Sequence, residues 1–392
     1  MKKILAMLLA LVMVMGLVAC GGNAPETTAP AETNAPAEST PAESTPAVSD
    51  VEYKIAMITD YGDITDQSFN QTTYEAVKAF AETNGVDYTY YKPQGDSTAE
   101  RIAMVDAAVV DGYNVIVMPG FAFGETLAEV ADIYPEVKFI ALDVAEGEGG
   151  FTATENVFSA VYQEELSGYM AGVAAVKLGY KHLGYLGGMA VPAVQRFGYG
   201  FLQGVDAAAK ELGIVGDIKV EYVYGNQFYG DADITAVMDT WYGEKGVECV
   251  FACGGGIWSS AAEAAAKVGG KVIGVDVDQA AIIDGQYGEG MTVTSAMKGL
   301  APTVNTLLTA IILEDNWAAY AGKIETLGLV SADPEANYVQ IPMGSTQFAE
   351  GFTAEDYKTL VAGMFDGTIT VSNDISAMPA VTYVINVYAD IK

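Results

Sequence analysis

Short apolar segments alternate along this chain with segments of helical periodicity, and this alternation limits the fold more than any other feature. Thr73, Val77 and Phe80, for example, recur at helical spacing. Strands that are apolar throughout and alternate with helices predict parallel sheets covered by helices on both faces. The predicted strands are Lys54–Thr59, Val115–Met118, Lys138–Leu142, His182–Leu186, Lys219–Tyr224, Cys249–Cys253, Lys271–Val275 and Thr292–Ala296. Capping boxes predict helix starts at Ser68, Ser97, Thr126 and Ser260.

The length of this alternating region predicts two α/β lobes. It begins near Val51, and roughly 340 residues are more than one hydrophobic core holds comfortably. A (β/α)₈ barrel would also have eight strands, but it needs a helix after the last one to close. The segment 323–392 looks mixed instead, which favours two lobes. It combines a predicted helix, Ala354–Met364, with strand-like Asn337–Pro342, Ile369–Val371 and Val381–Val387.

The N-terminus predicts export. Lys2 and Lys3 precede a short apolar stretch that ends at Val18, typical of a secretory signal peptide over residues 1–19 and short for a retained membrane helix. The sequence around Cys20 resembles the bacterial lipobox, which implies cleavage before Cys20 and a lipid on its thiol. Residues 20–50 then form a Pro-, Ala-, Thr- and Glu-rich tether with no predicted core.

Composition excludes several classes of function. The chain has 51 acidic against 19 basic residues, a net charge of -32, so it lacks the basic surface that a nucleic-acid-binding protein needs. A single histidine, His182, argues against histidine-rich metal sites and most catalytic triads. Cys249 and Cys253 lie about 13 Å apart on one strand, too far for a disulfide, so we expect buried free thiols.

Polar and glycine residues gather where the predicted strands end. Asp60, Asp143 and Asp276 each follow a strand, the strand near Thr292 runs into Lys298, and a glycine run follows Cys253. Ligands of open α/β sheets bind beyond the carboxyl ends of strands. Three carboxylates and one ammonium there suit a small polyhydroxylated molecule.

Each of these residues also has a plainer interpretation. An aspartate at a strand end often caps the next helix, and a glycine run is often only a turn. The acidic loop 60–70 could bind calcium, but its spacing is not that of an EF-hand, so no metal is predicted.

Five motifs in the same order resemble the basic membrane protein (BMP) family of substrate-binding lipoproteins. The first is Asp60-x-Gly62-x-x-x-Asp66-x-Ser68-Phe69-Asn70. The others are the segments 158–172 and 187–204, the Gly-Val-Asp-Val-Asp-Gln run at 274–279 and the Thr-Ser-Ala-Met-Lys run at 294–298. The resemblance to the family covers roughly residues 52–375.

The resemblance implies a type I periplasmic-binding-protein fold. Two doubly wound parallel-sheet lobes would be joined by three crossovers, with the ligand in the cleft between them. The crossovers are expected near residues 156–160, 277–282 and 320–326. The first lobe would comprise 52–157 and 281–321, and the second 158–280 and 322–392.

The resemblance also implies roles for individual residues. Asp60 would bind the edge of a nucleobase, Phe69 would stack on one face of the base, and Phe197 would lie opposite. Asp143, Asp276 and Lys298 would hold the ribose, while Asp278 could serve the hinge instead. Tyr61 stands where purine-binding members are expected to have asparagine, which leaves the choice between purine and pyrimidine open. The other expected ligand-binding residues are Asn70, Gly255 and Trp258.

The implied function is that of a lipid-anchored, monomeric receptor on the outer face of the cell membrane. It would capture a nucleoside by hinge closure and deliver it to the permease and ATPase of an ABC importer, without a cofactor. A sugar or autoinducer receptor of the same fold is an alternative. Other classes are a sensor for a membrane partner and an extracellular hydrolase with paired carboxylates.

Overall fold

The computed structural model describes residues 51–392. The predicted signal peptide, Cys20 and the tether lie outside the described residues. The compact unit Ser49–Lys392 contains two sheets, and only β12 is antiparallel to its neighbour. Between residues 51 and 392, no helix is long and apolar enough to cross a membrane.

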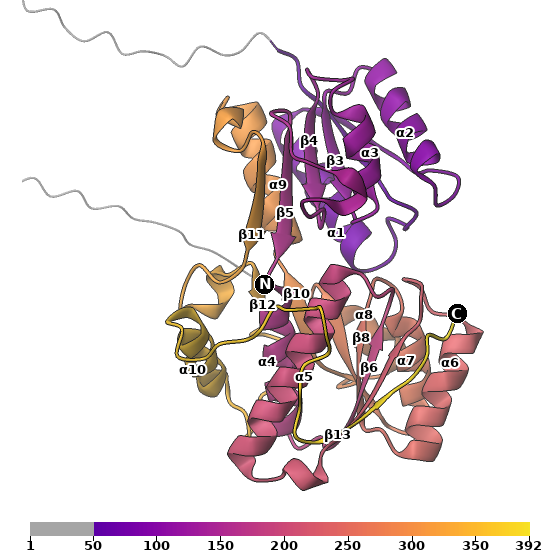
Figure 1. Cartoon of the computed structure of the whole chain (residues 1–392), viewed down its shortest axis with the longest axis vertical. Coiled ribbons are helices and arrows are strands. Elements are labelled where there is room, and N and C mark those ends of the chain that lie inside the picture. The colour runs from indigo at the N-terminus through magenta and orange to yellow at the C-terminus, as the bar shows by residue number, and fades with distance from the viewer. Residues whose placement is uncertain (1–50) are drawn as a thin grey trace, which may run out of the picture. The chain divides into compact units, whose positions relative to one another are not determined.

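The first sheet has the strand order β11-β5-β4-β3-β1-β2. Helices α1 and α9 pack on one face, and α2 and α3 pack on the other, so both faces are covered. Figure 1 shows β11 and α9 beside β5, although they come much later in the chain. The strands are β1 (Lys54–Ile58), β2 (Asp87–Tyr91), β3 (Val115–Pro119), β4 (Lys138–Leu142), β5 (Val157–Tyr162) and β11 (Lys323–Leu327). The helices are α1 (Phe69–Asn84), α2 (Thr98–Val110), α3 (Phe123–Val130) and α9 (Leu300–Leu308).

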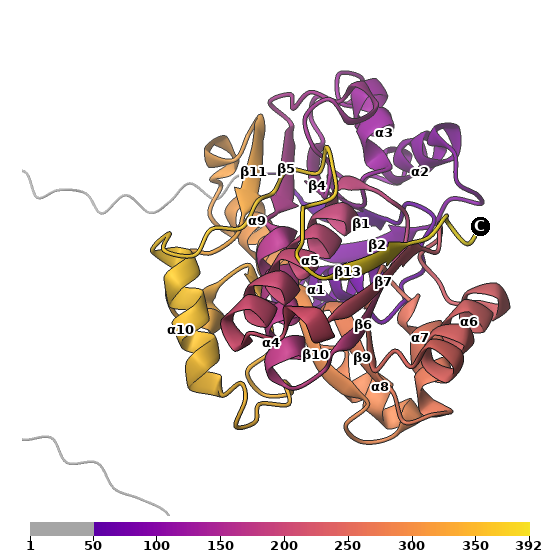
Figure 2. The same cartoon turned by 60° about the horizontal axis from the view of Figure 1, so that its bottom comes forward.

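The second sheet has the order β12-β10-β9-β8-β6-β7-β13. Helices α4, α5 and α10 contribute to the core on one face, and α6, α7 and α8 to the core on the other. Figure 2 shows β13 running along β7 at the edge. The strands are β6 (His182–Gly187), β7 (Lys219–Tyr224), β8 (Cys249–Cys253), β9 (Lys271–Asp276), β10 (Thr292–Lys298), β12 (Val339–Gln340) and β13 (Val384–Val387). The helices are α4 (Glu164–Lys177), α5 (Pro192–Leu212), α6 (Ala232–Asp239), α7 (Trp258–Ala266), α8 (Ala280–Tyr287) and α10 (Ala354–Phe365).

The two sheets repeat one topology. Strands β1 to β5 and β6 to β10 are arranged in the same order, so β4 in the first sheet occupies the place of β9 in the second. Likewise β5 corresponds to β10. Equivalent strand ends are therefore the ends of β4 and β9, and those of β5 and β10.

All eight predicted strands are present, and Cys249 and Cys253 are buried free thiols as predicted. Three strands, β2, β5 and β11, were not predicted from the sequence. Two of them, β2 and β11, are half-exposed edge strands with polar residues in alternation, so they lack the apolar run that marks the others. The segment Ile369–Val371 is not a strand, and Asn337–Pro342 contains only the two-residue β12.

The crossovers lie later in the chain than expected. Strand β5 pairs within the first sheet as far as Tyr162, and β10 pairs within the second as far as Lys298. Strand β11 then belongs to the first sheet as far as Leu327. The chain therefore changes sheets after Tyr162, Lys298 and Leu327, because each of these strands stays paired in its sheet to its last residue.

Only one of the four predicted capping boxes places its hydroxyl at a helix start as expected. Ser97 accepts a hydrogen bond from the backbone of Glu100 and caps α2. Thr126 and Ser260 lie inside α3 and α7, so these two predictions are wrong. Ser68 precedes α1 but makes no capping bond, because its hydroxyl has another partner in the site described next.

Candidate functional site

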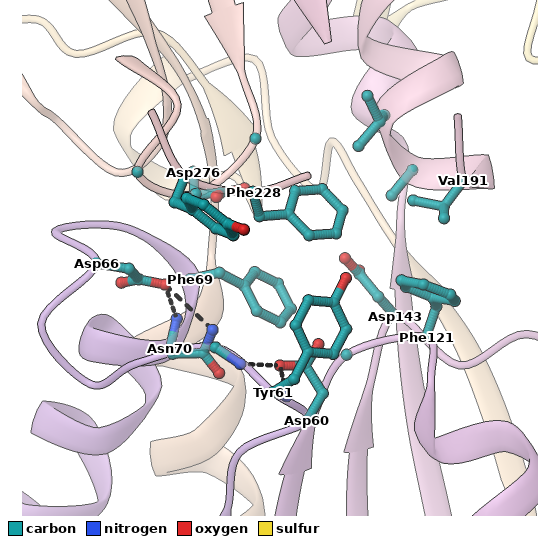
Figure 3. A pocket seen from close by; sticks show the side chains of 18 of the residues that line it. Asp60, Tyr61, Asp66, Phe69, Asn70, Phe121, Asp143, Val191, Phe228 and Asp276 are labelled. Atoms are coloured by element: carbon teal, nitrogen blue, oxygen red, sulfur yellow. Dashed lines mark hydrogen bonds between the residues drawn. The ribbon is translucent and has the colours of Figure 1, made fainter. Parts of the chain in front are cut away.

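A cavity of about 530 Å³ lies at the carboxyl ends of strands from both sheets. Its lining comes from the loops after β1, β3, β4, β7 and β8, from the ends of β9 and β10 and from the start of α5. All ten residues that the sequence predicted as ligand-binding line this cavity: Asp60, Tyr61, Phe69, Asn70, Asp143, Phe197, Gly255, Trp258, Asp276 and Lys298. Figure 3 shows several of them pointing into one space.

Two of these aspartates occupy equivalent positions with the same unusual backbone. Asp143 directly follows β4 and Asp276 ends β9, with φ angles of 63° and 65°. The left-handed region is uncommon for residues other than glycine, although aspartate and asparagine enter it more readily than most. Backbone strain of this kind concentrates at functional sites. The repeated topology thus brings one carboxylate from each lobe to the cavity.

Lys298, the last residue of β10, is the central cation of the cavity. Its ammonium lies 2.5 Å from Asp143 Oδ2 and 3.2 Å from Glu164 Oε1. The rings of Phe69, Tyr162 and Phe197 surround it, with centroids 4.9 to 5.5 Å away. Burial works to lower the pKa of this ammonium, but the carboxylates of Asp143, Glu164 and Asp276 outweigh burial and raise it.

Glu164 and Arg196 belong to the same charged cluster and were missed from the sequence. Glu164 lies in the first turn of α4 and is fully buried, and Arg196 Nε donates to its Oε2 at 2.6 Å. An acidic residue at a helix start is common, because it complements the helix dipole. Nothing in the local sequence therefore distinguished Glu164 from an ordinary first-turn acid.

The loop after β1 holds Asp60 by backbone contacts. Asp60 Oδ1 accepts hydrogen bonds from the N–H groups of Tyr61 at 2.6 Å and Gly62 at 2.8 Å. Its Oδ2 lies against Gly120, where a Cβ atom would approach to 2.6 Å at a φ of +129°. Gly120 must therefore remain glycine. Burial raises the pKa of the Asp60 carboxyl despite these N–H donors.

The end of this loop ties the two lobes together. Asp66 accepts hydrogen bonds from the N–H groups of Ser68, Asn70 and Gln71, so Asp66 caps α1 in place of Ser68. The Ser68 hydroxyl instead donates to Asp276 Oδ2 at 2.6 Å. The third carboxylate of the loop, that of Asp63, pairs with the Lys92 ammonium at 2.8 Å. The side chains of Asp60, Asp63 and Asp66 thus all bond to groups of the protein itself.

The aromatic residues are arranged differently from the expected pair of Phe69 and Phe197. Phe197 lines the cavity but is 2% exposed, and its ring packs edge-on against Phe251. Phe228 and Tyr61 instead stack with centroids 6.4 Å apart, and the Tyr61 hydroxyl donates to Met189 Sδ at 2.9 Å. Figure 3 shows the rings of Phe228 and Tyr61 close to that of Phe69. Phe228 follows the end of β7, so the strand-end rule could have identified it.

Several polar atoms of the cavity residues are buried without a hydrogen-bond partner. They are Asp143 Oδ1, Asn70 Oδ1 and Trp258 Nε1. A buried polar group without a partner costs free energy, so such groups mark places where a ligand can supply the missing bond. The cavity thus offers carboxylate and amide acceptors, an indole donor and aromatic faces.

Comparison with known proteins shows that the chain is similar to substrate-binding proteins of ABC transporters. A family model described as "ABC transporter substrate-binding protein PnrA-like" matches residues 53–332. The chain is 30% identical over 241 residues to the "ABC transporter nucleoside-binding protein BmpA" of Lactococcus lactis, with 58% of this chain and 65% of that relative covered. It is 26% identical over 284 residues to "Basic membrane protein B" of Borreliella afzelii, with 70% and 78% covered. The match thus spans just under two thirds of the length of the Lactococcus relative.

Solved structures give the same fold. A crystal structure of an ABC transporter solute-binding protein from Aeropyrum pernix aligns with a TM-score of 0.63 and 24% identity, covering 81% of this chain and 87% of the other. A solute-binding protein from Conexibacter woesei aligns with a TM-score of 0.62 and 20% identity, covering 82% and 99%. These neighbours support the two-lobed type I fold that the sequence predicted.

Proposed function

We propose that this chain, which belongs to the family of PnrA-like ABC transporter substrate-binding proteins, captures a nucleoside outside the cell and presents it to an ABC permease. The observation that carries the proposal is the juxtaposition, in one cavity, of flat aromatic rings with Asp143, Asp276 and Lys298. Aromatic rings accept the face of a base, and carboxylates accept hydrogen bonds from ribose hydroxyls. The name of the Lactococcus relative points to the same ligand class.

The geometry supports separate positions for the base and the ribose within the cavity. The base would lie between Phe69 and the ring pair of Phe228 and Tyr61, with its edge toward Asp60. The ribose would lie toward Lys298, where Asp143 Oδ1 lacks a partner. Phe197 would contact the Lys298 ammonium with its ring rather than stack on the base.

The charge of the cavity favours a nucleoside over a nucleotide. Six acidic residues and three basic ones line it: Asp60, Asp63, Asp66, Asp143, Glu148 and Asp276 against Lys92, Arg196 and Lys298. All three cations already pair with carboxylates. A phosphate group would therefore meet an excess of negative charge with no unpaired cation to receive it.

Capture would work by lobe closure. Bonds already link the lobes across the cavity, from Ser68 to Asp276 and from Lys298 to Asp143. A ligand that contacts both lobes only when they are closed shifts the population toward the closed form, which the permease would recognise. The predicted lipid on Cys20 would keep the receptor at the outer face of the membrane, within reach of the permease.

A thermal-shift panel on the compact unit, residues 49–392, tests the ligand class. A ligand that binds only the folded state raises the melting temperature. We expect shifts with one or more of adenosine, guanosine, cytidine and uridine, and none with ribose, free bases or the 5′-monophosphates. Shifts with pentoses or hexoses alone would instead identify a sugar receptor. Chromatographic detection of free base after incubation would contradict the binding-only function and indicate a hydrolase.

Nucleoside affinity should fall at acidic pH because of Asp276. Burial raises the pKa of this carboxyl to about 6, although Lys298 and the Ser68 hydroxyl lower it. Only the ionised form carries a negative charge and accepts hydrogen bonds at both oxygens, so affinity should be constant above pH 7 and about tenfold weaker at pH 5. Calorimetry between pH 5 and 8 measures this profile.

Protonation of Asp276 would not by itself unfold the protein. A carboxyl whose pKa is raised in the folded state binds more protons when folded, so Asp276 by itself stabilises the fold as the pH falls from 6 toward 4. A flat affinity profile down to pH 5 would show that Asp276 does not contact the ligand as a carboxylate.

A further inference from the structure

Lys298 contacts two carboxylates, those of Asp143 and Glu164, which differ in their position in the fold. Asp143 belongs to the loop after β4 of the first lobe, and Glu164 starts α4, directly after the chain has crossed to the second lobe. Lys298 itself stands at the end of β10, where the chain crosses back. Glu164 and Lys298 thus lie at the two neighbouring crossovers, whereas Asp143 lies on the first lobe alone.

Both carboxylate oxygens of Glu164 are paired with cations. Its Oε1 accepts from Lys298 at 3.2 Å and its Oε2 accepts from Arg196 at 2.6 Å, and the side chain is fully buried. Asp143, in contrast, uses only Oδ2 toward Lys298, and its Oδ1 is buried without a partner. Asp143 Oδ1 is therefore free to accept a ligand hydroxyl, whereas both oxygens of Glu164 already accept from cations and its side chain is closed off from the cavity by burial.

We propose that Glu164 is a positioning residue for ligand binding, which together with Arg196 holds the Lys298 ammonium in place while Asp143 exchanges part of its contact with that ammonium for a ligand hydroxyl. This inference rests on the proposed function, because it assigns Glu164 a part in the same site. Glu164 itself does not touch the ligand. It keeps Lys298 at the cavity when Asp143 turns to the ligand or moves away with the first lobe.

The electrostatics of the cluster agree with this division. Burial works to raise the pKa of the Glu164 carboxyl, but Lys298 and Arg196 outweigh it, so Glu164 stays ionised. Burial raises the pKa of Asp143 in spite of Lys298, and Glu164 adds to that rise. The charged groups that act on Asp143 are Lys298 and Arg196 as cations and Glu164, Asp276 and Glu148 as anions.

Glu164→Gln is the direct test, and Glu165→Gln is its matched control. Glu165 is the next residue in the same helical turn and is 2% exposed, but it is not bonded to Lys298 or Arg196, and its Oε2 has no partner. Because Glu164→Gln leaves the partly buried Arg196 without its anion, the double variant Glu164→Gln/Arg196→Gln is made as well. It removes one charge of each sign, so the buried cluster keeps its net charge.

Two measurements are made on the full-length protein. The first is calorimetric affinity for the four ribonucleosides at pH 8, where we expect at least a tenfold loss in Glu164→Gln and in the double variant, and less than a twofold change in Glu165→Gln. The second is a ligand-free ¹³C titration of the aspartate carboxyls, assigned with Asp143→Asn and Asp276→Asn. In Glu164→Gln the Asp143 carboxyl should titrate at lower pH, because it loses the neighbouring anion, and in Glu165→Gln it should not move.

The outcomes separate this inference from the proposed function. If wild-type protein binds no ribonucleoside but the Asp143 titration shifts only in Glu164→Gln, the function proposal fails, while the coupling of Glu164 to the Asp143–Lys298 pair, on which the positioning role depends, stands. If ribonucleosides bind equally well to wild type and to the folded double variant, the positioning role is refuted while the function stands. A shift of the Asp143 titration as large in Glu165→Gln as in Glu164→Gln would also refute it, because the effect would then not depend on contact with Lys298.

Discussion

Replacing Asp276 with asparagine should weaken nucleoside binding by about two orders of magnitude and leave the protein folded. The carboxylate would lose its charge and with it the charge-assisted bonds to ribose hydroxyls. Asparagine is the appropriate substitution because residue 276 has a φ of 65°, a conformation that asparagine adopts more readily than alanine. Calorimetry with the nucleoside that gives the largest thermal shift measures the loss.

The same variant should be at least as stable as wild type at neutral pH. The raised pKa of Asp276 means that its ionised form is disfavoured in the fold, and asparagine can still accept the hydrogen bond from Ser68. Asp278→Asn is the control, since Asp278 is exposed and bonds only to the backbone of Ala280 and to Ser345. Near wild-type affinity in folded Asp276→Asn would remove Asp276 from the binding site.

Lys298→Met should be the most damaging single change to the fold of this site. It would leave Asp143 and Glu164 buried beside each other without the cation between them. Breaking a buried ion pair from one side costs about 3–5 kcal/mol, so we expect a loss of that size in the free energy of unfolding and no measurable nucleoside binding. Urea denaturation followed by circular dichroism measures the stability.

Lys92→Met provides the comparison for this loss. Lys92 pairs with Asp63, but both side chains are largely in contact with solvent, so its removal should cost less than about 1 kcal/mol. If Lys298→Met were as stable as Lys92→Met, the carboxylates around Lys298 would have to be protonated or solvated, and its central role in the cluster would be wrong.

The local pattern of the sequence was enough to predict that four polar residues meet at the cavity. Asp60, Asp143, Asp276 and Lys298 each follow or end a parallel strand, and the carboxyl ends of parallel strands share one edge of their sheet. The length of the alternating region predicted two lobes, and the family resemblance implied that the ligand lies between them. Two of the three strands that the sequence missed, β2 and β11, lie at sheet edges, where one side is solvated and no continuous apolar run is needed.

Other features of the site were decided by tertiary structure alone. Whether Ser68 caps α1 or bonds to Asp276 depends on a residue 208 positions away in the chain. Glu164 resembles any acid in the first turn of a helix until Lys298, 134 positions away, is placed against it. The positions of the crossovers likewise depend on the sheet in which β5, β10 and β11 each pair.

Periodicity and strand ends are properties of neighbouring residues, so the sequence by itself determined most of the elements, the α/β class and the edge at which the polar cavity residues gather. The partner of a buried charge depends on distances of a few ångströms between segments far apart in the chain, and its pKa depends on how much water those segments exclude. That is why the sequence sufficed to predict Lys298 in the site, while only the folded chain identified the carboxylates that hold it there.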